Sequence, residues 1–102
     1  MNIILTTHAD ARLDQRAGAL GIREQVRIRN IEALRDRPNG KYYVVVYQHR
    51  TTMKYRPAGS RSETGHYLVA AVQKRGNRAI VKTIMVSNRT KWKDGQFINP
   101  AA

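Results

Sequence analysis

The chain contains no cysteine, few acidic residues, one tryptophan, one phenylalanine and no long apolar run. Without cysteine it has no disulfide bonds, thiolate zinc sites or cysteine nucleophiles. Its seven acidic residues are spread along 102 positions, so we expect no carboxylate cluster for magnesium and no two-metal nuclease site. Apolar runs such as 44–47 and 68–72 are far shorter than the roughly 20 residues of a membrane-spanning helix. We therefore expect no membrane partner.

The beginning of the sequence carries no secretion signal. Residues 1–7 lack a basic start followed by a long apolar stretch, so we expect an intracellular, cytoplasmic protein. We also expect that it uses no metal or other cofactor. A length of 102 residues and a hydrophobic content of 41% suit one globular domain with a modest core. We expect this core to span residues 3–87 and residues 88–102 to form a polar tail.

Positive charge is abundant and unevenly distributed. The chain has 19 Lys and Arg against seven acids, a net charge of +12. Residues 1–36 contain six arginines and five acids, a net of +1, whereas residues 37–102 contain thirteen basic residues and two acids, a net of +11. A surface with such an excess attracts polyphosphates, and counterion release favours their binding. This distribution predicts nucleic acid as the partner, although solubility alone, an acidic protein partner or a membrane surface would also explain a high charge.

The first third of the sequence has helical spacing. Thr7 and Asp10 resemble the residues of a capping box, and Gly18 and Gly21 can end a helix. Apolar residues recur three or four apart over residues 8–19, and a second set recurs three apart over residues 23–35. Residues 38–40 (PNG) form a strong turn signal. We predict two helices, whose apolar positions are Ala9, Leu13, Ala17 and Leu20 in the first and Ile28, Ile31 and Leu34 in the second.

After Gly40 the spacing becomes that of strands. Residues 41–48 are rich in β-branched and aromatic side chains, and residues 52–56 form a short candidate partner strand. Residues 66–74 and 78–87 form a hairpin around a turn at 75–77. The order of elements predicts an α+β fold with two N-terminal helices packed on a roughly four-stranded antiparallel sheet.

Three segments resemble a family of toxins and nucleases. They are residues 5–13 (LTTHADARL) with Arg16, residues 67–72 (YLVAAV) and residues 79–84 (AIVKTI). In this order they resemble the superfamily of barnase, EndoU, colicin ribonucleases and RelE-type toxins, and especially its small domains with a His-Ala-x-x-Arg motif. The resemblance implies the predicted fold, a toxin-like or phage-type role, and a ribosome or an antitoxin protein as partner. Because the superfamily holds active ribonucleases and domains without shown activity, it implies the fold more strongly than the reaction.

Four residues are candidates for RNA cleavage without a metal, which requires an acid, a base and cations near the phosphate. His8 and Arg12 lie one helical turn apart and share a face, although His8 could instead cap the helix and Arg12 could pair with an acid. His49 borders Arg50 at the end of a strand, and Tyr55 lies in a Lys-Tyr-Arg cluster that resembles RelE-type sites. An ordinary strand position without a catalytic role explains His49 and Tyr55 equally well. The candidate catalytic residues are His8, Arg12, His49 and Tyr55.

Basic and aromatic residues of the sheet half are candidates for nucleic-acid contacts, since such groups hold phosphates and stack on bases. Lys82 interrupts an apolar strand. Strict alternation places it on the same face as Ile80 and Ile84, where it lies either at an edge of the sheet or in a cleft. Trp92 offers a ring to a base or attaches the tail to the core. The predicted nucleic-acid-binding residues are Arg50, Lys54, Arg56, Lys74, Arg75, Lys82, Lys91 and Trp92.

Three functional hypotheses follow from the sequence. The first is a small basic nucleic-acid-binding protein, directed to RNA rather than DNA, that acts as a metal-independent, toxin-like endoribonuclease. The alternative is a non-catalytic protein that binds RNA or DNA, or inhibits a host machine as some phage proteins do. The third is a structural component of a ribonucleoprotein.

Overall fold

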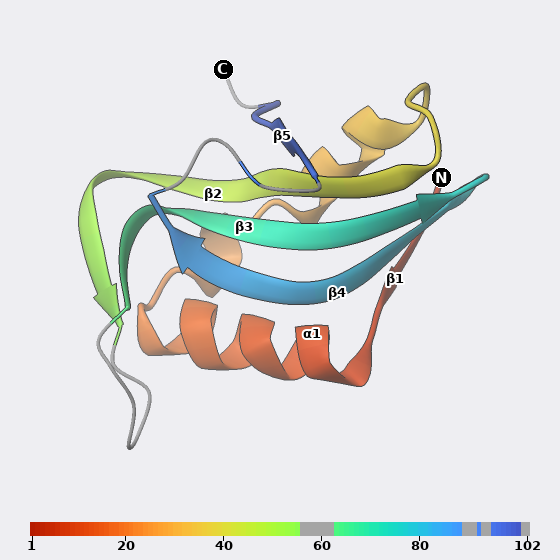
Figure 1. Ribbon diagram of the computed structural model, residues 1–102. Coiled ribbons are helices and arrows are strands. Elements are labelled where there is room, and N and C mark those ends of the chain that lie inside the picture. The colour runs from red at the N-terminus through yellow and green to blue at the C-terminus, as the bar shows by residue number, and fades with distance from the viewer. Residues whose placement is uncertain (56–62, 89–91, 93–94, 101–102) are drawn as a thin grey trace.

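The computed structural model describes residues 1–55, 63–88, 92 and 95–100. Of Glu63 it describes the backbone but not the side chain. It is an α+β fold with a five-stranded mixed sheet of order β1-β4-β3-β2-β5 (Figure 1). The strands are β1 (Asn2–Leu5), β2 (Gly40–Tyr55), β3 (Glu63–Arg75), β4 (Arg78–Ser87) and β5 (Gln96–Ile98). Strands β2, β3 and β4 are antiparallel as predicted. The prediction of a separate partner strand at residues 52–56 is wrong, because residues 52–55 continue β2 and pair with the start of β3. The outer strands correct the prediction, because β1 pairs in parallel with β4 and β5 in parallel with β2.

The first predicted helix is present and begins one residue earlier than expected. Helix α1 (Thr7–Leu13) continues as a π-helical turn, η1 (Asp14–Gly18). Its N-cap is Thr6 rather than Thr7, since the Thr6 Oγ1 accepts a hydrogen bond of 3.1 Å from the Ala9 N–H. In Figure 1, α1 runs along one side of the curved sheet.

The second predicted helix is replaced by two short 3₁₀ segments, η2 (Arg23–Gln25) and η3 (Ile28–Leu34). A 3₁₀ helix has three residues per turn, so side chains three apart lie directly above one another. The spacing of Ile28, Ile31 and Leu34 matches this period, and all three pack into the core. The same apolar triplet that predicted an α-helix therefore forms one side of a 3₁₀ helix.

The main core lies between the sheet and the helical segments. Buried side chains from alternate sheet positions, including Val44, Leu68, Ala70 and Val81, pack there against α1, η1 and η3. The opposite side of the sheet, called here the outer face, carries the intervening residues. In register they are Lys41, Tyr43 and Val45 of β2; Tyr67, Val69, Ala71, Gln73 and Arg75 of β3; and Arg78, Ile80, Thr83 and Met85 of β4.

A β-bulge in β4 changes the alternation. Ala71 pairs with Thr83 and Val72 with Val81, so Lys82 is an extra residue without a cross-strand partner. Because of this insertion, Val81 and Ile84 both lie in the helix-side core, whereas strict alternation places them on opposite faces. Thr6 holds the bulge, since its N–H donates to the Val81 carbonyl (3.1 Å) and its hydroxyl to the Lys82 carbonyl (3.3 Å).

Part of the outer face is covered by Trp92, Gly95 and Phe97. Trp92 stacks on Tyr43 with ring centroids 4.3 Å apart, and the Phe97 ring meets Tyr67 edge-on at 6.2 Å. Val45 and Val69 pair with each other on this face and are fully buried. In the described part of the chain, no helix is both long and apolar enough to cross a membrane.

Candidate nucleic-acid interface

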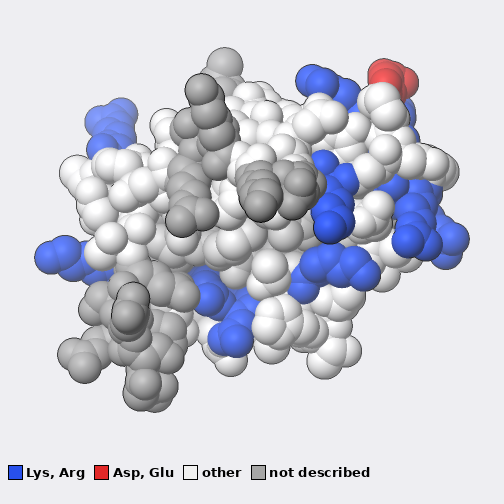
Figure 2. All heavy atoms as spheres, viewed as in Figure 1, with Lys and Arg blue, Asp and Glu red and all other residues white. Residues whose placement is uncertain are grey.

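The outer face near the β3–β4 turn is strongly basic. It carries Lys41, Arg75, Arg78 and Lys82, all of them exposed. Glu63, at the opposite end of β3, is the single acid in the sequences of β2, β3 and β4. Figure 2 shows this side of the molecule with Lys and Arg spread across it and, among the described residues, acidic atoms at one corner. With so few carboxylates nearby, these cations are available to an anionic ligand.

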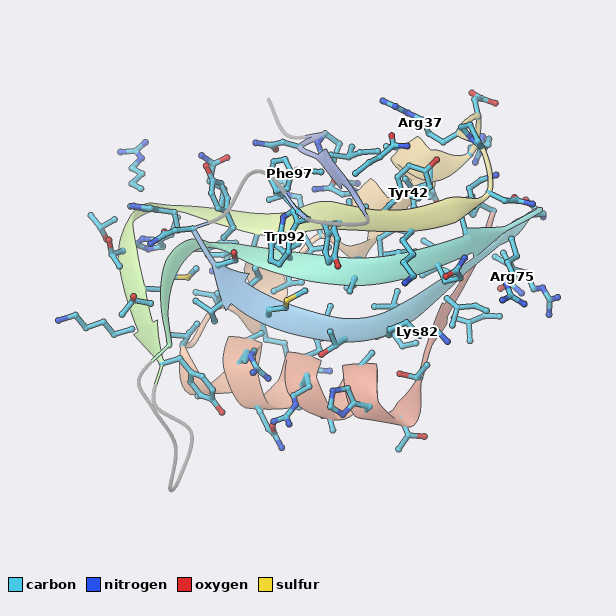
Figure 3. All side chains as sticks on the ribbon, viewed as in Figure 1. Arg37, Tyr42, Arg75, Lys82, Trp92 and Phe97 are labelled. Atoms are coloured by element: carbon cyan, nitrogen blue, oxygen red, sulfur yellow. The ribbon has the colours of Figure 1, made fainter. Side chains whose placement is uncertain are left out.

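Two of the lysines border a hollow in this surface. The hollow has a volume of about 220 Å³ and is lined by Lys41, Tyr42, Tyr43, Ala71, Val72, Gln73 and Lys82. It forms because Ala71, in the middle strand, has a short side chain, while the longer Lys41 and Lys82 rise from the strands on either side. Figure 3 shows Lys82 and Trp92 on this side of the sheet. An anionic group at the hollow would have an ammonium on each side.

The bulge also brings a histidine near the hollow. The His8 Nε2 lies 3.2 Å from the Thr83 Oγ1, and Thr83 pairs with Ala71, which lines the hollow. His8 is exposed in the first turn of α1. An imidazole can donate or accept a proton near neutral pH. An acid–base group therefore lies one strand away from the hollow.

Arg75 and Arg78 form the tip of the same basic surface. They are directly paired across the β3–β4 hairpin, and Figure 3 shows Arg75 at its projecting end. The tight turn depends on Gly76, whose φ of +57° is strained for residues with a side chain. The Gly76 N–H also donates to the Asn39 Oδ1 at 2.9 Å. This bond fixes the tip against the turn that precedes β2.

The other predicted catalytic residues lie elsewhere. The Arg12 guanidinium donates to the Gln15 Oε1 at 2.9 Å along its own helix. His49 lies in an irregular part of β2, where its Nδ1 accepts a bond of 3.1 Å from the Thr51 N–H. Tyr55 lies at the far end of β2, with the guanidinium of the buried Arg16 5.7 Å from its ring centre. The described contacts of His8 and Arg12 include neither His49 nor Tyr55, so the structure does not gather the four into one site.

The predicted nucleic-acid-binding residues fall into separate groups. Arg75 and Lys82 lie on the basic outer face, whereas Lys74 faces the helices and is only 5% exposed. Lys54 pairs with Thr64, ten residues along β3 from Lys74 and so about 33 Å away along the strand. Arg50 and Lys54, both exposed, thus lie far from the hollow. Trp92 is stacked on Tyr43, while Arg56 and Lys91 lie outside the described residues.

Sequence reasoning missed three residues of this surface, namely Lys41, Gln73 and Arg78. Strand alternation and the Gly76-centred turn could have placed Arg78 beside Arg75 on one face. Lys41 and Gln73 are directly paired, but they lie far apart in sequence, and no tight turn between them sets the register of their strands. The uniform apolar run over residues 42–47 gives no local mark of this register either.

A larger recess lies at the outer edge of β2. It has a volume of about 560 Å³ and is bordered by η2, η3 and Pro100. The Arg27 N–H donates to the Val46 carbonyl at 2.7 Å and the Asn30 Nδ2 to the Val45 carbonyl at 3.0 Å. These bonds pair two backbone carbonyls at the edge of β2, just beyond the residues that pair with β5. Glu24 and Arg27 both line the recess, so its charge is mixed and it is less suited to a polyanion than the outer face.

Comparison of the chain with protein-family models, with curated protein sequences and with solved structures gives no match.

Proposed function

We propose that the protein binds nucleic acid, and RNA in particular, through the outer face of its sheet. The observation that carries the proposal is the hollow bordered by Lys41 and Lys82, in a group of strands, β2 to β4, whose sequences contain one acid. Phosphate contacts from Lys and Arg supply most of the affinity of such proteins. A sheet with basic and aromatic side chains is also a common platform for unpaired RNA. The resemblance of residues 5–13, 67–72 and 79–84 to the barnase–EndoU–colicin–RelE superfamily supports the same proposal.

Neutralising the two lysines of the hollow tests this function. The double variant Lys41→Gln/Lys82→Gln should bind a single-stranded oligoribonucleotide at least about tenfold more weakly in moderate salt, because two phosphate contacts are lost. Fluorescence anisotropy measures the affinity. The matched control is Arg29→Gln/Arg35→Gln, which removes two exposed charges from the helical layer and should change affinity little. Equal losses from both double variants, or no binding by the unmodified protein, would contradict the proposal.

A second candidate function is cleavage of the bound RNA without a metal ion. The contact between His8 and Thr83, next to the hollow, favours it. In this reaction the 2′-oxygen would attack the phosphorus and displace the 5′-oxygen. His8 would take the 2′-hydroxyl proton or protonate the 5′-oxygen, with water in the other role, while Lys41 and Lys82 would stabilise the negative charge on the phosphate.

The substitution His8→Ala should reduce the cleavage rate in EDTA by about 10²–10⁴-fold, as removal of an acid or base typically does. The assay is a gel-based time course with RNA alone and with ribosomes. His66→Ala is the control, because His66 contacts Thr52 at the other end of the sheet. If His8→Ala cleaves as fast as the unmodified protein, the site needs another acid or base. If no cleavage is seen at all, the protein only binds.

A further inference from the structure

The hollow between Lys41 and Lys82 is small. Its volume of about 220 Å³ is below the range of roughly 300–1,000 Å³ that is usual for pockets enclosing a drug-sized ligand. A base pair of a duplex could lie across the surface but could not enter. One planar ring from an unpaired nucleotide fits the dimensions better, with its phosphate near the flanking ammonium groups.

The lining also has the chemistry of a base pocket. Ala71 provides a small apolar floor, and Tyr43 provides an aromatic wall. The Tyr43 ring is held in place by Trp92, which stacks on it, and by Gly95, where an added Cβ would clash with the ring. Aromatic groups next to basic ones hold unpaired bases in many RNA-binding proteins.

One polar side chain of the hollow can read the base edge. Gln73 is half-buried between Lys41 and Ile80, its partners on the neighbouring strands. Its amide offers both hydrogen-bond donors and an acceptor, a combination that matches the edge of a nucleobase. Lysines, in contrast, bind phosphate regardless of sequence.

We propose that the hollow is a pocket for one unpaired nucleotide, with Ala71 and Tyr43 contacting the base and Gln73 selecting it. This inference depends on the proposed function, since it names the form of nucleic acid that the same site takes. It makes single-stranded RNA the ligand and gives the protein a base preference at one position.

The substitution Ala71→Met tests the pocket because it fills the hollow without changing charge. We expect about tenfold weaker binding of a single-stranded hexaribonucleotide, the size of effect that loss of one base contact produces, and unchanged binding of an RNA duplex. Ala33→Met, at an exposed position of η3, is the matched control and should bind as the unmodified protein does. Circular dichroism confirms that each variant folds.

The substitution Gln73→Ala tests the selection. The unmodified protein should prefer one of the four homopolymeric hexaribonucleotides, and Gln73→Ala should reduce that preference at least about threefold while changing the mean affinity less, as expected for a base contact rather than a phosphate contact. The same titration with single-stranded DNA shows whether binding depends on the ribose. Unchanged single-strand binding by Ala71→Met, or an unchanged preference in Gln73→Ala, would overturn the base pocket while leaving nucleic-acid binding intact. Failure of the unmodified protein to bind any oligonucleotide would overturn both proposals.

Discussion

Arg75 and Arg78 face each other across the tip of the β3–β4 hairpin. Like charges that are directly opposite on one face of a sheet repel and destabilise the pair. Two guanidinium groups in this arrangement can, however, bind one phosphate from both sides. Repulsion between the two arginines thus lowers the stability of the fold, and binding of a polyanion would offset that loss.

This view predicts opposite effects of one substitution on stability and on binding. Arg78→Gln should raise the free energy of unfolding by about 0.2–1 kcal/mol, because the cross-strand repulsion is removed. The same variant should bind single-stranded RNA more weakly, since one phosphate contact is lost. Urea denaturation and anisotropy measure the two quantities. A variant that loses both stability and affinity would show that Arg78 has a structural role instead.

At the scale of elements, the contact between the ends of β3 and β4 is unusually close. A Cβ added to Gly65 would lie 2.5 Å from the carbonyl carbon and oxygen of Ser87. Backbone atoms cannot move aside as a flexible side chain can. Glycine at this position therefore allows β3 and β4 to approach each other near the end of the hairpin.

The substitution Gly65→Ala should consequently lower the free energy of unfolding by about 1–3 kcal/mol, the usual cost of overpacking. Gly18→Ala is the control. Gly18 lies at the end of η1, and an added Cβ would meet nothing within 4 Å, so this change should raise stability by up to about 1 kcal/mol. Thermal unfolding followed by circular dichroism compares the two. An equal or greater stability of Gly65→Ala would contradict the backbone contact.

The elements that the sequence predicted well are those formed by local interactions. Helix α1 and the β3–β4 hairpin each depend on a cap, a turn or an apolar repeat within a few residues. Strands β1 and β5 were missed because each is short and pairs with a strand distant in sequence. Their parallel pairing leaves no turn between partners that a sequence pattern could reveal.

The site was less predictable than the fold for the same physical reason. The charge distribution predicted a basic sheet, and two of the residues that the sequence singled out, Arg75 and Lys82, lie on its outer face. The hollow, however, depends on which strand positions are opposite each other, and the bulge at Lys82 shifts this register on β4. A bulge shifts the alternation by one residue, so pattern alone could not bring Lys41 and Lys82 to the two sides of Ala71.

At the scale of the molecule, charge is divided between the two layers. The helical segments carry Asp10, Asp14, Glu24 and Glu32, and Asp14 forms an ion pair with Arg23. The β2–β4 part of the sheet carries a large basic excess. This arrangement orients the protein so that its outer face meets a polyanion first.

Binding should therefore depend strongly on ionic strength. If Lys41, Lys82, Arg75 and Arg78 each contact a phosphate, a plot of log affinity against log salt concentration for single-stranded RNA should have a slope of about −3, at roughly −0.7 for each contact. The Lys41→Gln/Lys82→Gln variant should give a slope shallower by about 1.4, whereas Arg29→Gln/Arg35→Gln should keep the original slope. A slope close to zero would mean that binding does not depend on phosphate contacts.

The parallel pairing of β1 with β4 also has a consequence for how the chain folds during synthesis. Residues Asn2–Leu5 are made before their partners, Arg78–Val81, so β1 has no strand to join until β4 has left the ribosome. Contacts between such distant segments slow folding, because a long loop must close before they form. Until then, the apolar side chains of β1 and α1 have nothing to cover them, and newly made chains at this stage are suitable clients for chaperones.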